Sequence, residues 1–507
     1  MSDNKKIRLS REEIAKLEIG HTNVSTAQKW SLTLFFLLFI AIYPILQTVY
    51  RQPFAEWRDA GTVQQSIKAY ETAIEDSSLL RKYLLSPVQS WLTGTLKTGN
   101  EKVIVGRDGW LFFSGDCEYL LNPGFLLPEK LHKRRLSGVQ PDPAAAILDF
   151  NRQLRGRGIR LILLPVPVKP MIYPDKLGGA AAPLQNPSWA EFKKQMEAEG
   201  VTVIDLAAEL SAMRSDGVEP YLKTDTHWTP EAMTMAAEVL ARSISGDSFN
   251  RPDMAPESRT AAGDIAAMLK LPDSTRYFPA ETVQLLPLDG SFSRESEVLL
   301  LGDSFTNIYS LEAMNWGTGS GLAEHLAYYL GRPVDVIARN DAGAFATRQL
   351  LAGELKRGRD RLAGKTTVVW EFAIRELANG DWKMLDMTPG DPPGSELLEI
   401  VEPRTAIATV LAVSAVPRPN SAPYKDFVMS IYLGDIDGGA DRVLAYAAGM
   451  RDNVRTEEAG LRPGDRVRVR LTPWSEAEAQ YGSWSRGEFD DDELLLAAPC
   501  WAELQKP

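Results

Sequence analysis

The sequence predicts an α/β fold, a parallel sheet flanked by helices, which follows one membrane-spanning helix and precedes a small all-β domain. Three observations support this prediction. Residues 30–50 carry no charge, apolar strands alternate with helices between residues 141 and 372, and short strands separated by Pro, Gly and Asp follow residue 396. A chain of 507 residues is long enough for two or three such domains.

The uncharged segment at residues 30–50 reads WSLTLFFLLFIAIYPILQTVY, which is close to the ~20 residues that a membrane-spanning helix needs. More basic residues precede it than follow it closely, so the positive-inside rule places residues 1–29 in the cytoplasm and the bulk of the chain on the other side. A long preceding arm and a long apolar run favour a retained anchor over a cleaved signal peptide. Residues 51–100 are polar and helical in pattern, as expected of a stalk.

Strand and helix patterns alternate through the central region. The predicted strands are residues 159–168, 201–206, 296–304, 334–339 and 366–372, and the predicted helices between them are residues 141–158, 186–200, 321–331 and 343–358. Continuous apolar runs such as IRLILLPVPV are typical of parallel strands that are covered on both faces. The alternation therefore predicts a parallel sheet flanked by helices, in a domain at residues 101–385.

The C-terminal region, residues 397–507, consists of short strand patterns broken by turn residues, which predicts a small β-rich, OB-like domain. The Pro- and Gly-rich residues 386–396 form the natural linker. The two cysteines, Cys117 and Cys500, are compatible with a disulfide or with two buried thiols. With 67 acidic and 56 basic residues, no His/Cys cluster and no phosphate loop, the sequence indicates no nucleic-acid partner, no metal and no cofactor.

The stretch YLKTDTHWTPEAM contains a candidate acid–base pair. Thr229 and Pro230 begin a helix, with Thr229 as the N-cap, so Asp225 and His227 lie in the loop before it. Residues two apart in extended backbone point the same way, so the carboxylate can hold the imidazole tautomer. A structural turn is the alternative, because Asp and Thr often satisfy turns.

The candidate nucleophile is Ser304, in the Gly-Asp-Ser that ends the strand at residues 296–304. Ligands of open α/β sheets bind at the carboxyl ends of the strands, and a serine at a helix N-terminus has N–H groups aimed at a developing oxyanion. The alternative is a simple helix cap. The next predicted strand ends in Asn340-Asp341-Ala342-Gly343, where Asn340 and the Gly343 N–H are further candidate oxyanion donors.

These motifs resemble the SGNH hydrolase superfamily. Because the Asp-x-His block precedes the serine, the order resembles one branch, the alginate O-acetyltransferase family of AlgJ/AlgX type. Residues 100–385 carry the resemblance, in VIVGRDGWLFF, VPVKPMIYPDKL, TDTHWTP, LLLGDSF and VVWEFAIREL. The resemblance implies Ser304 as nucleophile, His227 as general base and acid, and Asp225 as the orienting carboxylate. One departure is that no Gly-x-Asn-Asp block follows the strand at residues 366–372.

The resemblance further implies a single-pass protein of the bacterial inner membrane, with its catalytic domain in the periplasm. It would move an acetyl group through an acetyl-serine onto hydroxyls of an exopolysaccharide such as alginate, with the acetyl group supplied through a multi-spanning membrane acyltransferase. A carbohydrate acetylesterase and a non-catalytic glycan-binding scaffold are the alternatives. Candidate substrate-binding residues are aromatic side chains that can stack on sugars and arginines that can bind a carboxylate, with core packing and internal ion pairs as the alternatives: Trp228, Tyr309, Trp316, Arg348 and Arg375.

Overall fold

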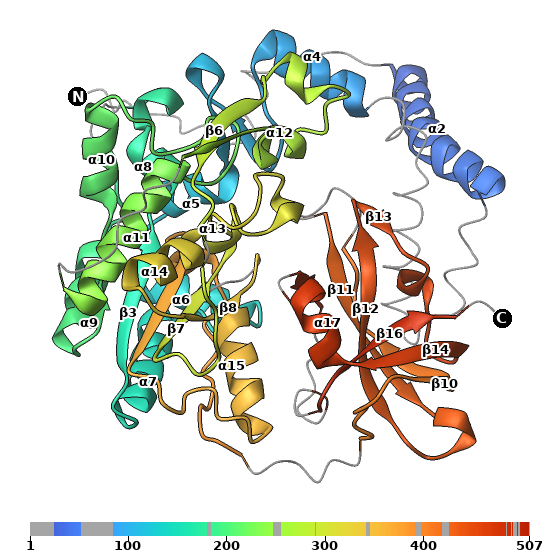
Figure 1. Cartoon of the computed structure of the whole chain (residues 1–507). Coiled ribbons are helices and arrows are strands. Elements are labelled where there is room, and N and C mark those ends of the chain that lie inside the picture. The colour runs from blue at the N-terminus through green and yellow to red at the C-terminus, as the bar shows by residue number, and fades with distance from the viewer. Residues whose placement is uncertain are drawn as a thin grey trace, which may run out of the picture. The chain divides into compact units, whose positions relative to one another are not determined.

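The computed structural model contains two compact units, Met1–Val88 and Gln89–Pro507 (Figure 1). It describes residues 25–51, 85–179, 184–246, 255–288, 290–340, 345–390, 397–417, 425–482, 484–487, 489, 494 and 497–505. The predicted cytoplasmic arm and most of the predicted stalk lie outside these residues.

The first unit contains helix α2 (Thr26–Arg51), which includes the segment predicted to span a membrane. Several of its apolar side chains are exposed, among them Trp30 and Phe35. Within the described residues, no helix has the combination of length and apolarity that a membrane crossing requires.

The α/β domain is built on a five-stranded sheet in the order β4-β3-β9-β7-β8, and every neighbouring pair is parallel. The strands are β3 (Arg160–Val166), β4 (Thr202–Val203), β7 (Val298–Gly302), β8 (Asp335–Ala338) and β9 (Thr367–Ala373). All residues of β7 and β9 are buried, as their continuous apolar runs predicted. The predicted parallel sheet is therefore confirmed.

Helices surround this sheet (Figure 1). They include α7 (Pro143–Arg155), α9 (Trp189–Ala198), α11 (Pro230–Ser245), α14 (Leu322–Leu330) and α15 (Ala346–Lys356). The domain also contains α5 (Ser114–Leu121), α6 (Pro128–Leu136), α8 (Lys169–Ile172), α10 (Ala207–Ser215), α13 (Ser304–Asn307) and α16 (Glu376–Asn379). Helix α4 (Ser86–Leu96) spans the boundary between the two units. Helices α7 and α11 both begin with a proline after a capping side chain, Asp142 and Thr229, because proline lacks the N–H that a first-turn residue would leave unpaired.

Two antiparallel strand pairs lie outside the parallel sheet. Strands β1 (Val103–Val105) and β2 (Leu111–Phe113) pair around a turn of sequence Gly-Arg-Asp-Gly. Strands β5 (Glu257–Ala261) and β6 (Glu281–Leu285) also pair, and the short helix α12 (Asp264–Met268) lies between them in sequence. The sequence patterns did not predict this second pair.

The C-terminal region forms a barrel-like domain. Its elements are β10 (Arg404–Val413), β11 (Phe427–Gly434), β12 (Val443–Arg451), β13 (Val454–Arg455), β14 (Arg466–Pro473), α17 (Trp474–Tyr481), β15 (Ser485–Arg486) and β16 (Cys500–Leu504). The sheet closes because β11 pairs with both β10 and β12, while β12 continues through β16 and β14 back to β10. Cys117 and Cys500 are both free and buried, so the disulfide alternative is wrong.

Candidate active site

The loop that carries Asp225 and His227 is closed on itself by main-chain contacts. An isolated antiparallel bridge joins Tyr221 to Trp228, and the Leu222 N–H donates to the His227 carbonyl at 3.2 Å. Asp225 and His227 are each only 2% exposed. The two side chains are thus presented from a buried, tightly closed turn directly before α11.

Ser304 is the first residue of α13, two residues after Gly302, the last residue of β7. Asp303 fixes this turn, because its carboxylate accepts from the Phe305 N–H and from the Ala373 N–H of β9, both at 2.8 Å. Gly302 is required by space, since a Cβ atom there would lie 2.2 Å from the Thr306 hydroxyl oxygen. The serine is therefore held at the carboxyl end of the sheet.

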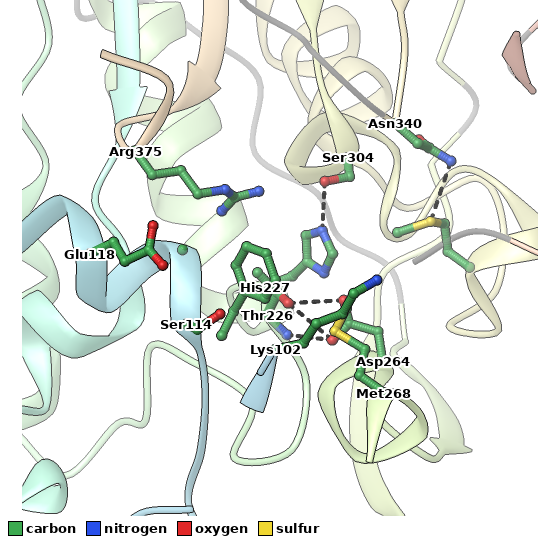
Figure 2. A pocket seen from close by; sticks show the side chains of 13 residues that line it. Lys102, Ser114, Glu118, Thr226, His227, Asp264, Met268, Ser304, Asn340 and Arg375 are labelled. Atoms are coloured by element: carbon green, nitrogen blue, oxygen red, sulfur yellow. Dashed lines mark hydrogen bonds between the residues drawn. The ribbon is translucent and has the colours of Figure 1, made fainter. Parts of the chain in front are cut away.

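The two loops meet in a continuous hydrogen-bonded series. His227 Nε2 lies 2.8 Å from Ser304 Oγ, and His227 Nδ1 lies 2.7 Å from Asp225 Oδ1 (Figure 2 shows the Ser304–His227 contact). With Nδ1 protonated toward the carboxylate, Nε2 is free to accept the serine proton. This arrangement can activate a serine hydroxyl.

The negative charges around the site stabilise the protonated form of His227. Burial raises the pKa of Asp225, but the hydrogen bond and charge of His227 outweigh burial and lower it to about 2. Burial lowers the pKa of His227, whereas the hydrogen bond and charge of Asp225, with Asp264 and Asp303, give a net rise. Asp225, His227 and Asp264 lie close enough to suggest a metal site, but both ring nitrogens of His227 face the hydrogen-bond partners above.

Two donors are available for an oxyanion. Among the described residues, the Ser304 main-chain N–H has no acceptor. The Asn340 side chain accepts from Asn307 Nδ2 at 2.7 Å, and its own Nδ2 contacts only the weak acceptor Met314 Sδ at 3.5 Å. Gly343, the other predicted donor, lies outside the described residues.

The family model for the SGNH hydrolase-like domain of the acetyltransferase AlgX matches residues 103–374, which include both loops. The chain belongs to this family.

Curated relatives of this AlgX-type domain are named as probable alginate O-acetylases AlgJ. The protein from Pseudomonas putida is 30% identical over 196 residues, or 38% of this chain and 44% of that protein. The protein from Pseudomonas aeruginosa is 30% identical over 181 residues, or 34% of this chain and 42% of that protein. The chain therefore spans less than half the length of these relatives. The solved O-acetyltransferase domain of Pseudomonas putida AlgJ is 24% identical, with a TM-score of 0.39 over 54% of this chain and 92% of that domain.

A pocket of about 330 Å³ in the AlgX-type domain opens onto Ser304 and His227. Its lining mixes apolar, basic and acidic side chains and includes Lys102, Phe113, Glu118, Met268, Met314 and Arg375. Arg375 points toward His227 and Ser304 from the side opposite Asn340 (Figure 2). The reacting groups are therefore accessible to a substrate in a confined, partly charged space.

The three aromatic residues predicted to stack on sugar do not line this pocket. Trp228, Tyr309 and Trp316 are fully buried, so this prediction is wrong. They hold the two loops instead: Trp228 Nε1 donates to the Phe305 carbonyl at 3.1 Å, and the Tyr309 hydroxyl donates to the Trp228 carbonyl at 2.7 Å. The indole N–H of Trp316 donates to Asp225 Oδ2 at 3.0 Å.

Arg348 is also not a substrate residue, because it is 1% exposed. Its guanidinium carbon lies 4.8 Å from the ring centroid of Trp370 and 5.9 Å from that of Trp382, and Nη1 donates to the Lys383 carbonyl at 3.0 Å. Burial lowers the pKa of Arg348 to about 10. Its position among aromatic rings is that of a core residue.

We expect Arg348→Ala to lower the free energy of unfolding by about 2–4 kcal/mol, through lost packing and cation–π contacts. Thermal or denaturant unfolding would measure this change. Any activity per folded molecule should stay close to that of the parent chain. An unchanged stability together with a lost activity would contradict the core assignment.

Three charged groups around the site were not predicted from the sequence, the fully buried Glu371 and the partly buried Asp264 and Glu281. Asp264 and Glu281 contact the Asp225–His227 loop, and Glu371 of β9 accepts from the Asp303 N–H at 2.9 Å and the Thr306 hydroxyl at 2.7 Å. Burial, followed by the Asp303 charge, raises the pKa of Glu371. No local motif marks these three residues, because each contacts residues that are distant in the sequence.

Proposed function

We propose that this chain transfers an acetyl group onto a hydroxyl of an exopolysaccharide through an acetyl-serine at Ser304. The observation that carries the proposal is the series Ser304 Oγ, His227 and Asp225, with successive distances of 2.8 and 2.7 Å. Membership of the AlgX family and relatives named as alginate O-acetylases support an acetyl group and an anionic glycan such as alginate.

In the first half-reaction, His227 Nε2 takes the Ser304 proton while Oγ forms a bond to the acetyl carbonyl carbon of the donor. The Ser304 N–H and Asn340 Nδ2 stabilise the oxyanion. The tetrahedral intermediate then expels the donor's leaving group, which receives the proton from His227. This step leaves acetyl-Ser304 and a neutral imidazole.

In the second half-reaction, His227 takes the proton of a sugar hydroxyl, whose oxygen bonds to the acetyl carbon. The Ser304 Oγ bond breaks, and Ser304 recovers its proton from His227. Water can follow the same route, so transfer requires that the pocket positions the sugar and excludes water.

The test uses a soluble activated acetyl ester with and without an alginate oligosaccharide. Acetylated oligosaccharide as the main product supports transfer. Free acetate at the same rate in both samples would assign the chain as an acetylesterase instead. No turnover and no covalent acetylation would leave a glycan-binding scaffold.

We also propose attachment to the bacterial inner membrane through residues 30–50, with the AlgX-type domain in the periplasm. The uncharged sequence and the exposed apolar side chains of α2 support attachment. An acetyl donor delivered through a multi-spanning membrane acyltransferase would suit this location. Recovery of the full chain in the wash fraction of membranes, without detergent, would contradict attachment.

Arg375 is the residue that we propose for the carboxylate of an anionic acceptor. Its Nη1 donates to Asp116 Oδ1 at 3.0 Å, and its side chain is 17% exposed in the pocket that contains Ser304. Burial lowers the pKa of Arg375, but Asp116 and other carboxylates outweigh it, so the guanidinium stays charged. Among the described residues, the other guanidinium nitrogens have no side-chain or carbonyl acceptor.

We expect Arg375→Lys to raise the KM for an alginate oligosaccharide roughly 10-fold, because a lysine cannot pair with Asp116 and a second carboxylate in the same planar geometry. The KM for a neutral oligosaccharide should change less than about threefold. Steady-state transfer with both acceptors measures the difference. Equal losses with both acceptors would contradict a role in binding the carboxylate.

A further inference from the structure

The segment at residues 255–288, which contributes no strand to the parallel sheet, lies against the loop that carries the acid–base pair. Two of its carboxylates contact this loop. Asp264 is the first residue of α12, and Glu281 is the first residue of β6. Neither takes part in the proton transfers described above.

Asp264 contacts the loop residue Asp225 and the residue that follows it, Thr226. Its main-chain N–H donates to Asp225 Oδ2 at 3.0 Å. Its Oδ1 accepts from the Thr226 N–H at 2.7 Å, and its Oδ2 accepts from the Thr226 hydroxyl at 2.9 Å. Asp225 Oδ1 faces the imidazole, and Asp225 Oδ2 accepts from the Asp264 N–H and from Trp316 Nε1. Because both oxygens are bonded, the carboxylate cannot rotate without losing these bonds.

Glu281 fixes the residues just before Asp225. Its Oε2 accepts from the Lys223 N–H at 2.8 Å, and its Oε1 accepts from the Thr224 N–H at 2.9 Å and from the Thr224 hydroxyl at 2.6 Å. Two carboxylates from one segment thus satisfy three main-chain N–H groups of this loop, those of residues 223, 224 and 226.

Gly263 permits this close approach. A Cβ atom at position 263 would lie 2.2 Å from both the carbonyl carbon and the oxygen of Thr224. The Ala266 N–H also donates to the Thr224 carbonyl at 3.1 Å. Any larger residue at position 263 would push α12 away from the loop.

We propose that Asp264 is a positioning residue for the acid–base pair: its main-chain N–H and carboxylate fix the Asp225–Thr226–His227 loop, and its charge stabilises the imidazolium of His227. The consequences for acetyl transfer rest on the proposed function. Glu281 assists by fixing the loop upstream, and it acts through contacts alone.

Several charged groups face these side chains. Those acting on His227 are Asp225, Asp264 and Asp303; those acting on Asp264 include Asp225 and His227; and the buried Lys169 interacts with Asp225, Asp264, Glu281 and Asp116. Burial, followed by the Asp225 charge, raises the pKa of Asp264 to about 6. At neutral pH Asp264 is therefore largely charged and raises the pKa of His227, which must be neutral to accept the serine proton.

Asp264→Asn separates charge from contact. An asparagine can still accept from the Thr226 N–H, and its amide can donate to the Thr226 hydroxyl. The rate of Ser304 acylation by an activated acetyl ester is measured against pH. Without the charge of Asp264 the pKa of His227 falls. We therefore expect the acidic limb of the pH–rate profile to move to lower pH by roughly 0.5–1 unit. Glu281→Gln, the matched control, should leave the limb at the pH of the parent chain.

Thr226→Val tests the contact separately, since it removes the hydroxyl and keeps the charge of Asp264. We expect a rate lower by roughly 10-fold without movement of the limb. An Asp264→Asn limb at the parent pH would overturn the role of the charge. A Thr226→Val rate equal to that of the parent would overturn the positioning role, even if Asp264→Asn fails to fold.

A parent chain that acquires no acetyl group would overturn the proposed function instead. In that case, NMR titration of the His227 ring in the parent chain and in Asp264→Asn still tests the charge. An unchanged ring pKa would then overturn this inference by itself.

Discussion

Ser304→Ala should abolish covalent acetylation of the chain and lower acetyl transfer by roughly 10³–10⁶-fold, because the variant has no oxygen to attack the acetyl carbon. Intact mass after incubation with an activated acetyl ester measures the first effect, and acetylated oligosaccharide measures the second. The folded state should persist, since the Ser304 Oγ bonds only His227 among the described residues.

Ser114→Ala is the matched control for this experiment. Ser114 lines the same pocket, but its hydroxyl donates to the Glu101 carbonyl at 2.9 Å and contacts no imidazole. The Ser114 variant should still gain one acetyl group. An acetyl adduct that persists in Ser304→Ala would show that another residue is the nucleophile, and the proposed mechanism would be wrong.

Asp225→Asn should lower the acylation rate by roughly 10³–10⁴-fold, because an amide no longer holds the Nδ1-protonated tautomer or stabilises the imidazolium. The site makes this change severe. Asp225 accepts from the His227 N–H, His227 Nδ1, the Asp264 N–H and Trp316 Nε1. Asparagine offers one acceptor oxygen, so at least one buried donor loses its partner.

Stability should therefore fall as well, by about 1–3 kcal/mol for each buried group left unsatisfied. Thermal unfolding separates this effect from catalysis, because the rate can be measured well below the transition. A folded Asp225→Asn chain that retains more than a tenth of the parent rate would exclude Asp225 as the orienting carboxylate.

The sheet could be predicted because β3, β7 and β9 are continuous apolar runs, separated by segments with helical patterns. Ser304 and Asn340 follow two neighbouring strands, β7 and β8, so topology brings them together at one edge. The Asp225–His227 loop could be found because few residue combinations place a carboxylate and an imidazole on one side just before a helix cap. The roles of these residues could be predicted from their immediate sequence neighbours.

Other residues could not be predicted because their roles depend on contacts distant in sequence. Asp264 and Glu281 begin two elements of only five residues each, and they meet residues 223–226 only through the tertiary fold. Trp228 and Trp316 lie near the motifs, and nothing in their sequence context distinguishes a buried indole from one that faces a pocket. Arg348 occupies a helix, where a charged residue is ordinarily expected at the surface.

The Trp228–Phe305 hydrogen bond joins the residues that directly follow His227 and Ser304, and Tyr309 adds a second bond from α13's side of the site to the Trp228 carbonyl. The spacing of the reacting pair is thus a property of the resting fold, and no glycan has to arrive to create it. A serine-directed sulfonyl fluoride should accordingly label the chain in plain buffer. Under the proposed mechanism, selectivity between acceptors would then be set in the second half-reaction, by which alcohol reaches the acetyl-serine.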